Sequence, residues 1–198
     1  MEVSLAASEG IVKRAIDRGT ITPDHTLAVG ERIYNYFNRE RVEEIRVALG
    51  LPKVDEVSIK ELFTGFVAEM DMASSYKPVM LLALLDCVDT HGKAKLSDVV
   101  RSFRCFYELR KEAAHVVERA TARMFRIDSL DDATVQRIML EMPFEKFERR
   151  KYLKYDRDLA YVRFDAALWR QLDSEDLARI RSICEQSIAA YYERINNP

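Results

Sequence analysis

Hydrophobic side chains recur at helical spacing along most of the chain, and this pattern predicts a mainly helical protein. Gly19 ends the first periodic stretch, and Thr22 and Pro23 are typical of the start of the next helix. Four helices are predicted in this part of the chain, over residues 4–18, 22–37, 40–49 and 58–70. We therefore expect residues 1–72 to form an N-terminal helical block.

A second group of elements follows a short polar segment at residues 71–75. Residues 79–85 are apolar on nearly every side, which predicts a helix at the centre of a core. An amphipathic helix is predicted from residue 96, with Ser97 and Asp98 as capping residues. A third helix is predicted over residues 131–141, ending before Pro143. The stretch between residues 115 and 129 has no pattern that assigns it to one element.

The hydrophobic period then changes from helical to alternating. The runs 152–156 and 160–164 alternate and are rich in aromatic residues, so they predict a β-hairpin with its turn at residues 157–159. A final long helix begins near Ser174. Three helices followed by a hairpin is the order of a winged helix. The expected fold is thus a mainly α protein, with a winged-helix-like domain and long C-terminal helix over residues 73–198.

Composition narrows the class of protein. The 198 residues include 31 Lys and Arg against 33 Asp and Glu, so bulk charge does not indicate a nucleic-acid-binding protein. The three cysteines are odd in number and form no C-x-x-C pair, which argues against a disulfide framework and a structural zinc site. There is neither a secretory leader pattern nor an apolar run long enough to span a bilayer. We expect a cytoplasmic protein that does not associate with membranes.

The sequence offers no recognisable catalytic motif. The six glycines are scattered, and Gly92-Lys93 continues into Ala94, so the phosphate-binding loop of ATP-driven motors is missing. No E-x-K or D-x-K pair suggests a restriction-type nuclease, and the three histidines are far apart. We expect no catalytic residues, no metal and no cofactor. An acidic cluster that assembles only in space, as in a hydrolase, is the alternative.

Local charge gives a different picture from the total. Residues 145–163 contain seven basic and four acidic side chains, and residues 101–126 contain seven basic and three acidic ones. Lysines and arginines on a helix and an adjoining hairpin can neutralise nucleic-acid phosphates. The alternative is an ordinary solvated surface. The predicted phosphate contacts are Arg101, Arg104, Arg110, Lys146, Arg149, Arg150, Lys151, Lys154 and Arg157.

Three segments carry a family resemblance: SSYKPVMLLALLD at 74–86, FRCFYELR at 103–110, and MPFEKFERRKYLKYDRDLAYVRFDAALWRQL at 142–172. Together they resemble a C-terminal accessory region of bacterial DEAD/DEAH-box helicase-like and restriction-type proteins, over about residues 58–195. The resemblance implies a domain that works with a superfamily-two motor, although these residues contain no motor.

The opening of the first segment is also similar to the sulfur-binding, modification-sensing domains of some endonucleases. That similarity implies that Tyr76, Lys77 and Pro78 contact the nucleic acid. Alternatively, Pro78 simply begins a core helix.

We therefore expect a DNA- or RNA-binding accessory domain of a helicase or restriction-type defence protein, without its own motor or nuclease site. The alternative function is a docking module that packs on the helicase motor or on a partner subunit.

Overall fold

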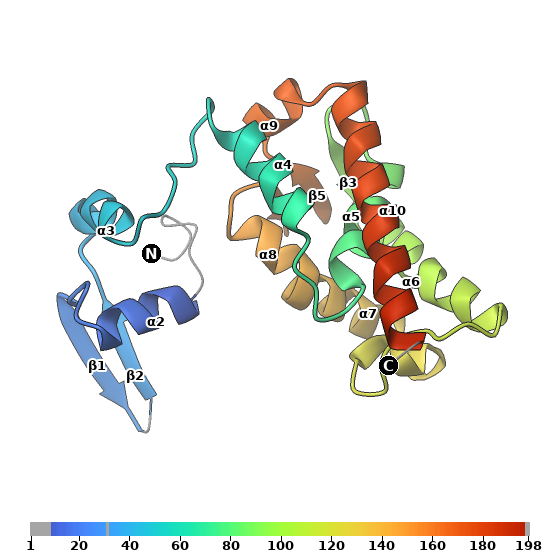
Figure 1. The fold of residues 1–198 in the computed structure, drawn as a ribbon, viewed down its shortest axis with the longest axis horizontal. Helices are drawn as coiled ribbons and strands as arrows, with labels where there is room; N and C mark the ends of the chain where they lie inside the picture. Colours follow the sequence, from blue (N-terminus) through green and yellow to red (C-terminus); the bar gives the residue numbers. More distant parts are fainter. Residues whose placement is uncertain (1–8, 31, 197–198) are drawn as a thin grey trace. The chain divides into compact units, whose positions relative to one another are not determined.

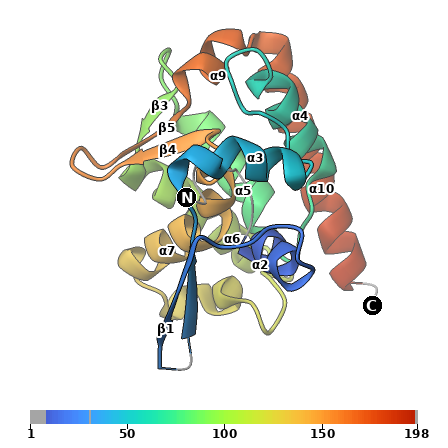
Figure 2. The same ribbon diagram turned by 90° about the vertical axis from the view of Figure 1, so that its left-hand side faces the viewer.

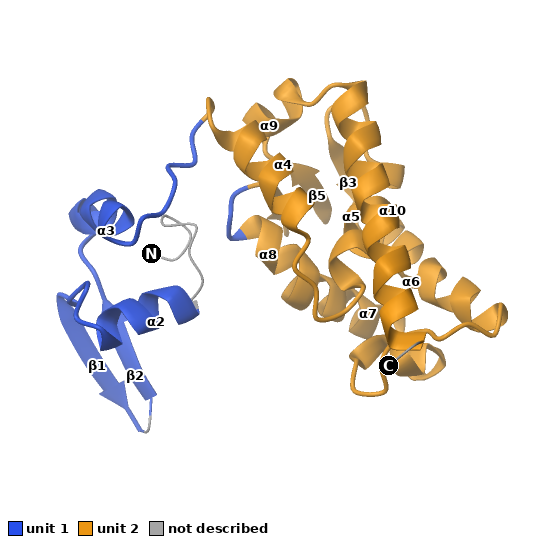
Figure 3. Cartoon of the chain, viewed as in Figure 1, with its two compact units in different colours: residues 1–55, 149–151 blue, residues 56–148, 152–198 orange. Residues whose placement is uncertain are grey.

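The computed structural model describes residues 9–30 and 32–196, and it is mainly helical, as the sequence predicts, with two small sheets. The chain forms two compact units (Figure 3). The first consists of Met1–Asp55 and Arg149–Lys151, and the second of Glu56–Glu148 and Tyr152–Pro198. The sequence placed a boundary near residue 72, whereas in the structure the helix that follows Ser58 belongs to the second unit.

The first unit is a small α/β assembly (Figure 1). Its elements are α2 (Glu9–Asp17), β1 (His25–Val29), β2 (Arg32–Tyr36), the 3-10 turn η1 (Arg39–Arg41) and α3 (Val42–Ala48). Ala15, Ile21 and Ile45 form its buried core, which brings α2 and α3 together. The predicted helices near residues 4–18 and 40–49 are confirmed in their described parts, while residues 4–8 lie outside the described residues.

The helix predicted over residues 22–37 is wrong, because β1 and β2 form an antiparallel hairpin there. Leu27 pairs with Tyr34 across the two strands, and His25 pairs with Tyr36. Apolar and aromatic residues alternate in both strands, which suits a pleated strand better than a helix face. Gly30, with φ of 60°, supplies the positive φ that a tight turn between the strands needs.

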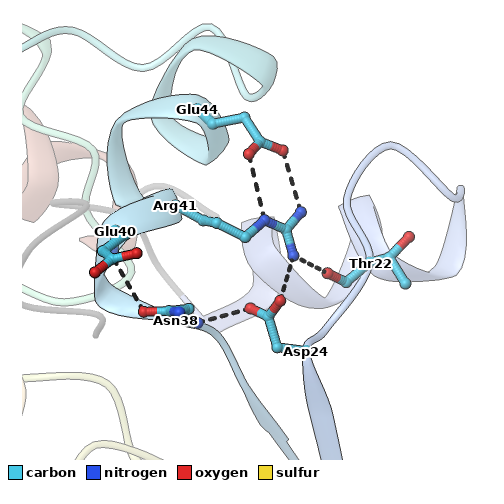
Figure 4. A network of polar contacts seen from close by, with 6 residues as sticks. All are labelled: Thr22, Asp24, Asn38, Glu40, Arg41 and Glu44. Atoms are coloured by element: carbon cyan, nitrogen blue, oxygen red, sulfur yellow. Dashed lines mark hydrogen bonds and ion pairs between the residues drawn. The ribbon is translucent and has the colours of Figure 1, made fainter.

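Arg41 ties the base of this hairpin to α3 (Figure 4). Its guanidinium donates to Asp24 Oδ1 at 2.8 Å, to the Thr22 carbonyl at 3.1 Å and to both carboxylate oxygens of Glu44. Asp24 also accepts a hydrogen bond from the backbone N–H of Asn38 at 2.6 Å. That bond and Arg41 lower the pKa of Asp24 below its ordinary value.

The second unit contains the remaining helices and a three-stranded sheet. In chain order its elements are α4 (Ile59–Glu69), α5 (Tyr76–Cys87), β3 (Lys93–Lys95), α6 (Leu96–Glu112), η2 (Arg123–Ser129), α7 (Asp132–Met139), η3 (Leu140–Phe144), α8 (Glu145–Glu148), β4 (Leu153–Asp156), β5 (Tyr161–Phe164), α9 (Ala166–Gln171) and α10 (Ser174–Asn196). The predicted helices and the predicted hairpin of this region are present.

The strands lie in the order β3, β5, β4, and both pairings are antiparallel (Figure 2). The hairpin β4–β5 is the predicted one, and β3 is an addition that the sequence did not reveal. The inward side chains Ala94, Leu153, Val162 and Phe164 are buried. Since side chains alternate along a strand, the residues between them form the opposite, outer face of the sheet.

The core of the second unit surrounds α5, which is buried on nearly all sides as predicted. Phe63 of α4 packs edge to face against Tyr152 and Phe164. Phe103 and Tyr107 of α6 pack in the same way against Tyr76 of α5. Burying large aromatic side chains in this way is a major source of stability for a domain of this size.

Two local features differ from the expected boundaries. The helix predicted to stop before Pro143 continues as a π-helical turn, Leu140–Phe144, that contains this proline. A π turn changes the hydrogen-bonding partners along the helix, and such turns occur where a proline interrupts the regular ladder. The amphipathic helix begins at Leu96 with Lys95 at its N-cap, so Ser97 already lies inside the helix. The unassigned stretch 115–129 ends in the 3-10 segment η2.

Candidate nucleic-acid interface

Of the predicted phosphate contacts on α6, Arg104 is engaged inside the fold. It donates to Glu108 at 2.6 Å, to the Leu130 carbonyl at 2.8 Å and to Asp132 at 3.1 Å. These bonds join α6 to the start of α7. Only 20% of its side chain is exposed. A guanidinium whose donors are satisfied in this way has little left to offer a phosphate.

Arg110 and Arg101, also on α6, have different surroundings. The guanidinium of Arg110 lies over the Tyr192 ring of α10 and donates to the Val116 carbonyl at 2.9 Å. It therefore links α6 to α10. Arg101 has an exposed side chain and one long ion pair, at 3.4 Å, to Asp98 in the preceding turn. Of the predicted α6 residues, Arg101 is the most accessible to a ligand.

The next predicted cluster follows α7. Lys146 on α8 forms an ion pair at 3.2 Å with its neighbour Glu145. Arg149, Arg150 and Lys151 are half-buried in a turn where Lys151 has φ of 63°, a conformation that non-glycine residues rarely adopt. This turn groups with the first unit and not with the hairpin that follows it.

The hairpin supplies two more of the predicted residues. Lys154 on β4 donates to Asp165 at 2.7 Å, and Asp165 also caps α9 through the N–H groups of Ala167 and Leu168. Arg157 is exposed in the turn between β4 and β5. The structure thus places one predicted cation on the sheet and one at the hairpin tip.

Tyr76 and Lys77, which the resemblance suggested as extra contacts, begin α5. Tyr76 is only 2% exposed, and its hydroxyl accepts a hydrogen bond from the backbone N–H of Met124 at 2.9 Å. Lys77 lies with its ammonium 5.2 Å from the centre of the Phe66 ring on α4. Tyr76 therefore belongs to the core of the second unit, and half-buried Lys77 packs against Phe66 of the same unit.

The predicted phosphate contacts do not include three basic residues on the outer face of the sheet. Lys93 and Lys95 project from this face of β3, and Arg163 projects from the same face of β5. The alternation of Lys93-Ala94-Lys95, with only the alanine buried, is the signal that could have revealed them. They add to Lys154 on the neighbouring strand.

A buried polar cluster was also missed. Glu118, 1% exposed, accepts hydrogen bonds from the Ser75 hydroxyl at 2.6 Å, from the Ser75 N–H at 3.1 Å and from the Tyr191 hydroxyl. The Tyr107 hydroxyl lies 3.0 Å from Ser75 Oγ, and Tyr192 donates to the backbone at 2.7 Å. Burial raises the pKa of Tyr192 to about 12. Burial and the hydrogen bond to Glu118 raise the pKa of Tyr191, so both phenols keep their protons. The cluster holds the segment before α5, the loop after α6 and α10 together.

The chemistry open to these side chains is limited in the part of the chain that the structure describes. There, no group of three or more His, Cys, Asp and Glu residues comes together as a metal site would require. Burial raises the pKa of Cys184 to about 12, and it also raises that of Cys87. A thiol with a raised pKa is a poor nucleophile at neutral pH.

Within residues 9–30 and 32–196, no helix is long and apolar enough to cross a membrane. The comparisons with known proteins add no relative to this picture: no family model, no curated protein and no solved structure matches the chain significantly.

Proposed function

We propose that the chain is a nucleic-acid-binding accessory module whose second unit is a winged-helix-like domain. The observation that supports this most is the element order helix α5, strand β3, helices α6 and α7, then the hairpin β4–β5, with strand order β3-β5-β4. A helix–strand–helix–helix–hairpin domain of this kind uses its helices and its hairpin to approach a duplex. The basic residues on the hairpin and sheet supply charges that suit phosphates.

The resemblance to helicase-associated regions gives the proposal its context. In that context the module would work beside a superfamily-two motor, and it would hold the nucleic acid without performing chemistry. Affinity in such a module comes chiefly from phosphate contacts and is therefore sensitive to salt.

Fluorescence anisotropy tests the proposal directly. The purified chain is titrated against a labelled duplex of mixed sequence and against the corresponding single strand, across a series of salt concentrations. We expect salt-sensitive binding, with the logarithm of the association constant falling by about 0.9 per phosphate contact per logarithmic unit of salt on a duplex. Absence of binding at low salt would contradict the proposal.

The turn at residues 149–151 has its own test in the same assay. Simultaneous charge reversal at Arg149, Arg150 and Lys151 is expected to weaken binding to all sequences and to lower the salt dependence, because fewer phosphate contacts release fewer counterions on binding. An unchanged slope would remove this turn from the interface. Circular dichroism on the variant checks that it remains folded.

A second candidate function is a docking module, and one observation favours it. In the first unit, one face of the β1–β2 hairpin carries Leu27, Val29, Tyr34 and Tyr36, each at least 43% exposed. Grouped exposed apolar residues are typical of protein-binding surfaces. The partner would be the motor or another subunit. This function predicts motor binding that is insensitive to salt and that a Leu27→Ser, Tyr34→Ser variant loses.

A further inference from the structure

Three basic residues lie side by side across the outer face of the three-stranded sheet. Arg163 in the central strand β5 is directly opposite Lys93 of β3 on one side and Lys154 of β4 on the other. Neighbouring strands are about 4.8 Å apart, so the row spans on the order of 10 Å. We call Lys93, Arg163 and Lys154 the basic row.

Such a row is unfavourable for the isolated protein, because like charges directly opposite each other on a sheet repel. Lys154 has a partner, Asp165, beside the row. Lys93 and Arg163, in contrast, form no ion pair among the described residues. The next row along the sheet consists of Lys95, Tyr161 and Asp156, so the six residues of the two rows include four basic side chains and one acidic side chain.

The helix that follows α6 does not share this character. The exposed charged residues at the start of α7 are Asp131 and Asp132, and Asp132 is bound to Arg104. Arg137 is the one exposed basic residue of α7. A helix with acidic residues at its leading end is poorly suited to enter a groove lined by phosphates. The charge of the second unit therefore favours its sheet over α7 as the nucleic-acid contact.

We infer that the nucleic-acid backbone runs across the outer face of the sheet, on the basic row and Arg157 at the hairpin tip, and that α7 is not inserted into a groove. This inference rests on the proposed function and specifies its surface. A duplex rises by about 3.4 Å per base step along its axis, so a row of this length covers on the order of three steps measured along the axis. Contacts of this kind read no base edges, so binding should be independent of sequence.

Four single variants of the full chain test the surface by anisotropy on the labelled duplex. Arg163→Gln and Lys93→Gln remove the charges of the row, and Arg137→Gln removes the exposed charge of α7. Arg126→Gln is the matched control, since Arg126 is an exposed arginine of η2 outside both surfaces. We expect Arg163→Gln and Lys93→Gln each to weaken binding by about threefold to tenfold. Each should also lower the magnitude of the salt slope by about 0.9, the value for one phosphate contact. Arg137→Gln and Arg126→Gln should bind like the wild type.

The midpoint of thermal unfolding separates binding from stability. Because the positive charges of the row repel one another, the Arg163→Gln variant should unfold at the same temperature as the wild type or higher. Its weaker binding would then not result from misfolding. A loss of binding in Arg137→Gln with none in the row variants would overturn the inference and leave the proposed function intact. No binding by the wild-type chain would overturn both.

Discussion

The guanidinium carbon of Arg110 lies 3.3 Å from the centre of the Tyr192 ring, which links the end of α6 to the C-terminal helix α10. An arginine over an aromatic face is stabilised by the ring quadrupole and, when partly desolvated, contributes more than an exposed ion pair. Since Arg110 also donates a hydrogen bond to the Val116 carbonyl, its guanidinium interacts with other residues of the second unit. This arginine had been a predicted phosphate contact.

The first prediction concerns that side chain. Arg110→Ala should lower the free energy of unfolding by about 1–3 kcal/mol, because both the ring contact and the hydrogen bond are lost. Urea denaturation followed by circular dichroism measures the change. Arg101→Ala, on the same helix but with an exposed side chain, should stay within about 0.5 kcal/mol of wild type. Equal effects for the two variants would contradict the role given to Arg110.

The second prediction concerns the turn before β3. Gly92 has φ of 70°, and a Cβ atom placed there would lie 2.5 Å from Cδ2 of Trp169. Gly92→Ala should therefore destabilise the protein by about 2 kcal/mol or more, from the unfavourable φ and from displacement of the indole.

Gly65, inside α4, is the matched control for this substitution. A Cβ atom there would have nothing within 4 Å, and its backbone is helical. Gly65→Ala should raise stability by about 0.5–1 kcal/mol. Thermal unfolding of both variants measures the effects, and a stabilised Gly92→Ala variant would show that the turn adapts.

The third prediction addresses the buried carboxylate. Both oxygens of Glu118 accept hydrogen bonds, so Glu118→Gln places an amide N–H₂ group against the donors of either Ser75 or Tyr191. We expect a loss of about 3 kcal/mol in the free energy of unfolding, because buried donors are left without acceptors. Glu112→Gln, at the exposed end of α6, should be close to neutral in the same urea titration.

The fourth prediction is a pH dependence in the first unit. The pKa of Asp24 is lowered from 3.8 by the Asn38 N–H and by Arg41, so its folded pKa lies below its unfolded one. The stability that this group contributes is present above about pH 3.8 and is lost as the pH falls through the lower folded pKa. Carboxyl-detected NMR titration should place its midpoint below 3.8.

Two substitutions test the cause of that shift. Arg41→Ala should move the midpoint of Asp24 upward, toward its ordinary value, while part of the shift remains because the Asn38 hydrogen bond is kept. Arg46→Ala should leave the midpoint unchanged, because Arg46 pairs with Glu43 on α3. A midpoint that does not respond to Arg41→Ala would show that Arg41 contributes nothing to it.

Strong local patterns in the sequence predicted part of this fold. The continuous apolar run of α5 and the alternating aromatic runs of β4 and β5 each admit one simple interpretation. The N-terminal hairpin was mistaken for a helix because Thr22 and Pro23 resemble a helix start and the apolar residues after them fit both periods. The alternation of Leu27 with Val29, and of Tyr34 with Tyr36, was the signal to follow.

Other features depend on residues far apart in the sequence, and no local pattern reveals them. Strand β3 has three residues and is defined by its pairing with β5, where Lys93 faces Arg163. The partners of Glu118, Ser75 and Tyr191, come from distant segments. The basic residues predicted to bind phosphate were chosen by charge alone, and charge does not show that Arg104 is already engaged. Their contact with nucleic acid stays a prediction.

Trp169 provides the second unit with an intrinsic fluorescence probe. Its indole N–H donates to the Thr90 carbonyl at 3.1 Å, and its ring lies 5.0 Å from that of Phe164 at the end of β5. Because it is the only tryptophan in the sequence, emission excited at the red edge of the absorption band comes from this one place. A titration with unlabelled nucleic acid can therefore be followed without a dye. The emission therefore reports the unfolding of the second unit, to which Trp169 belongs.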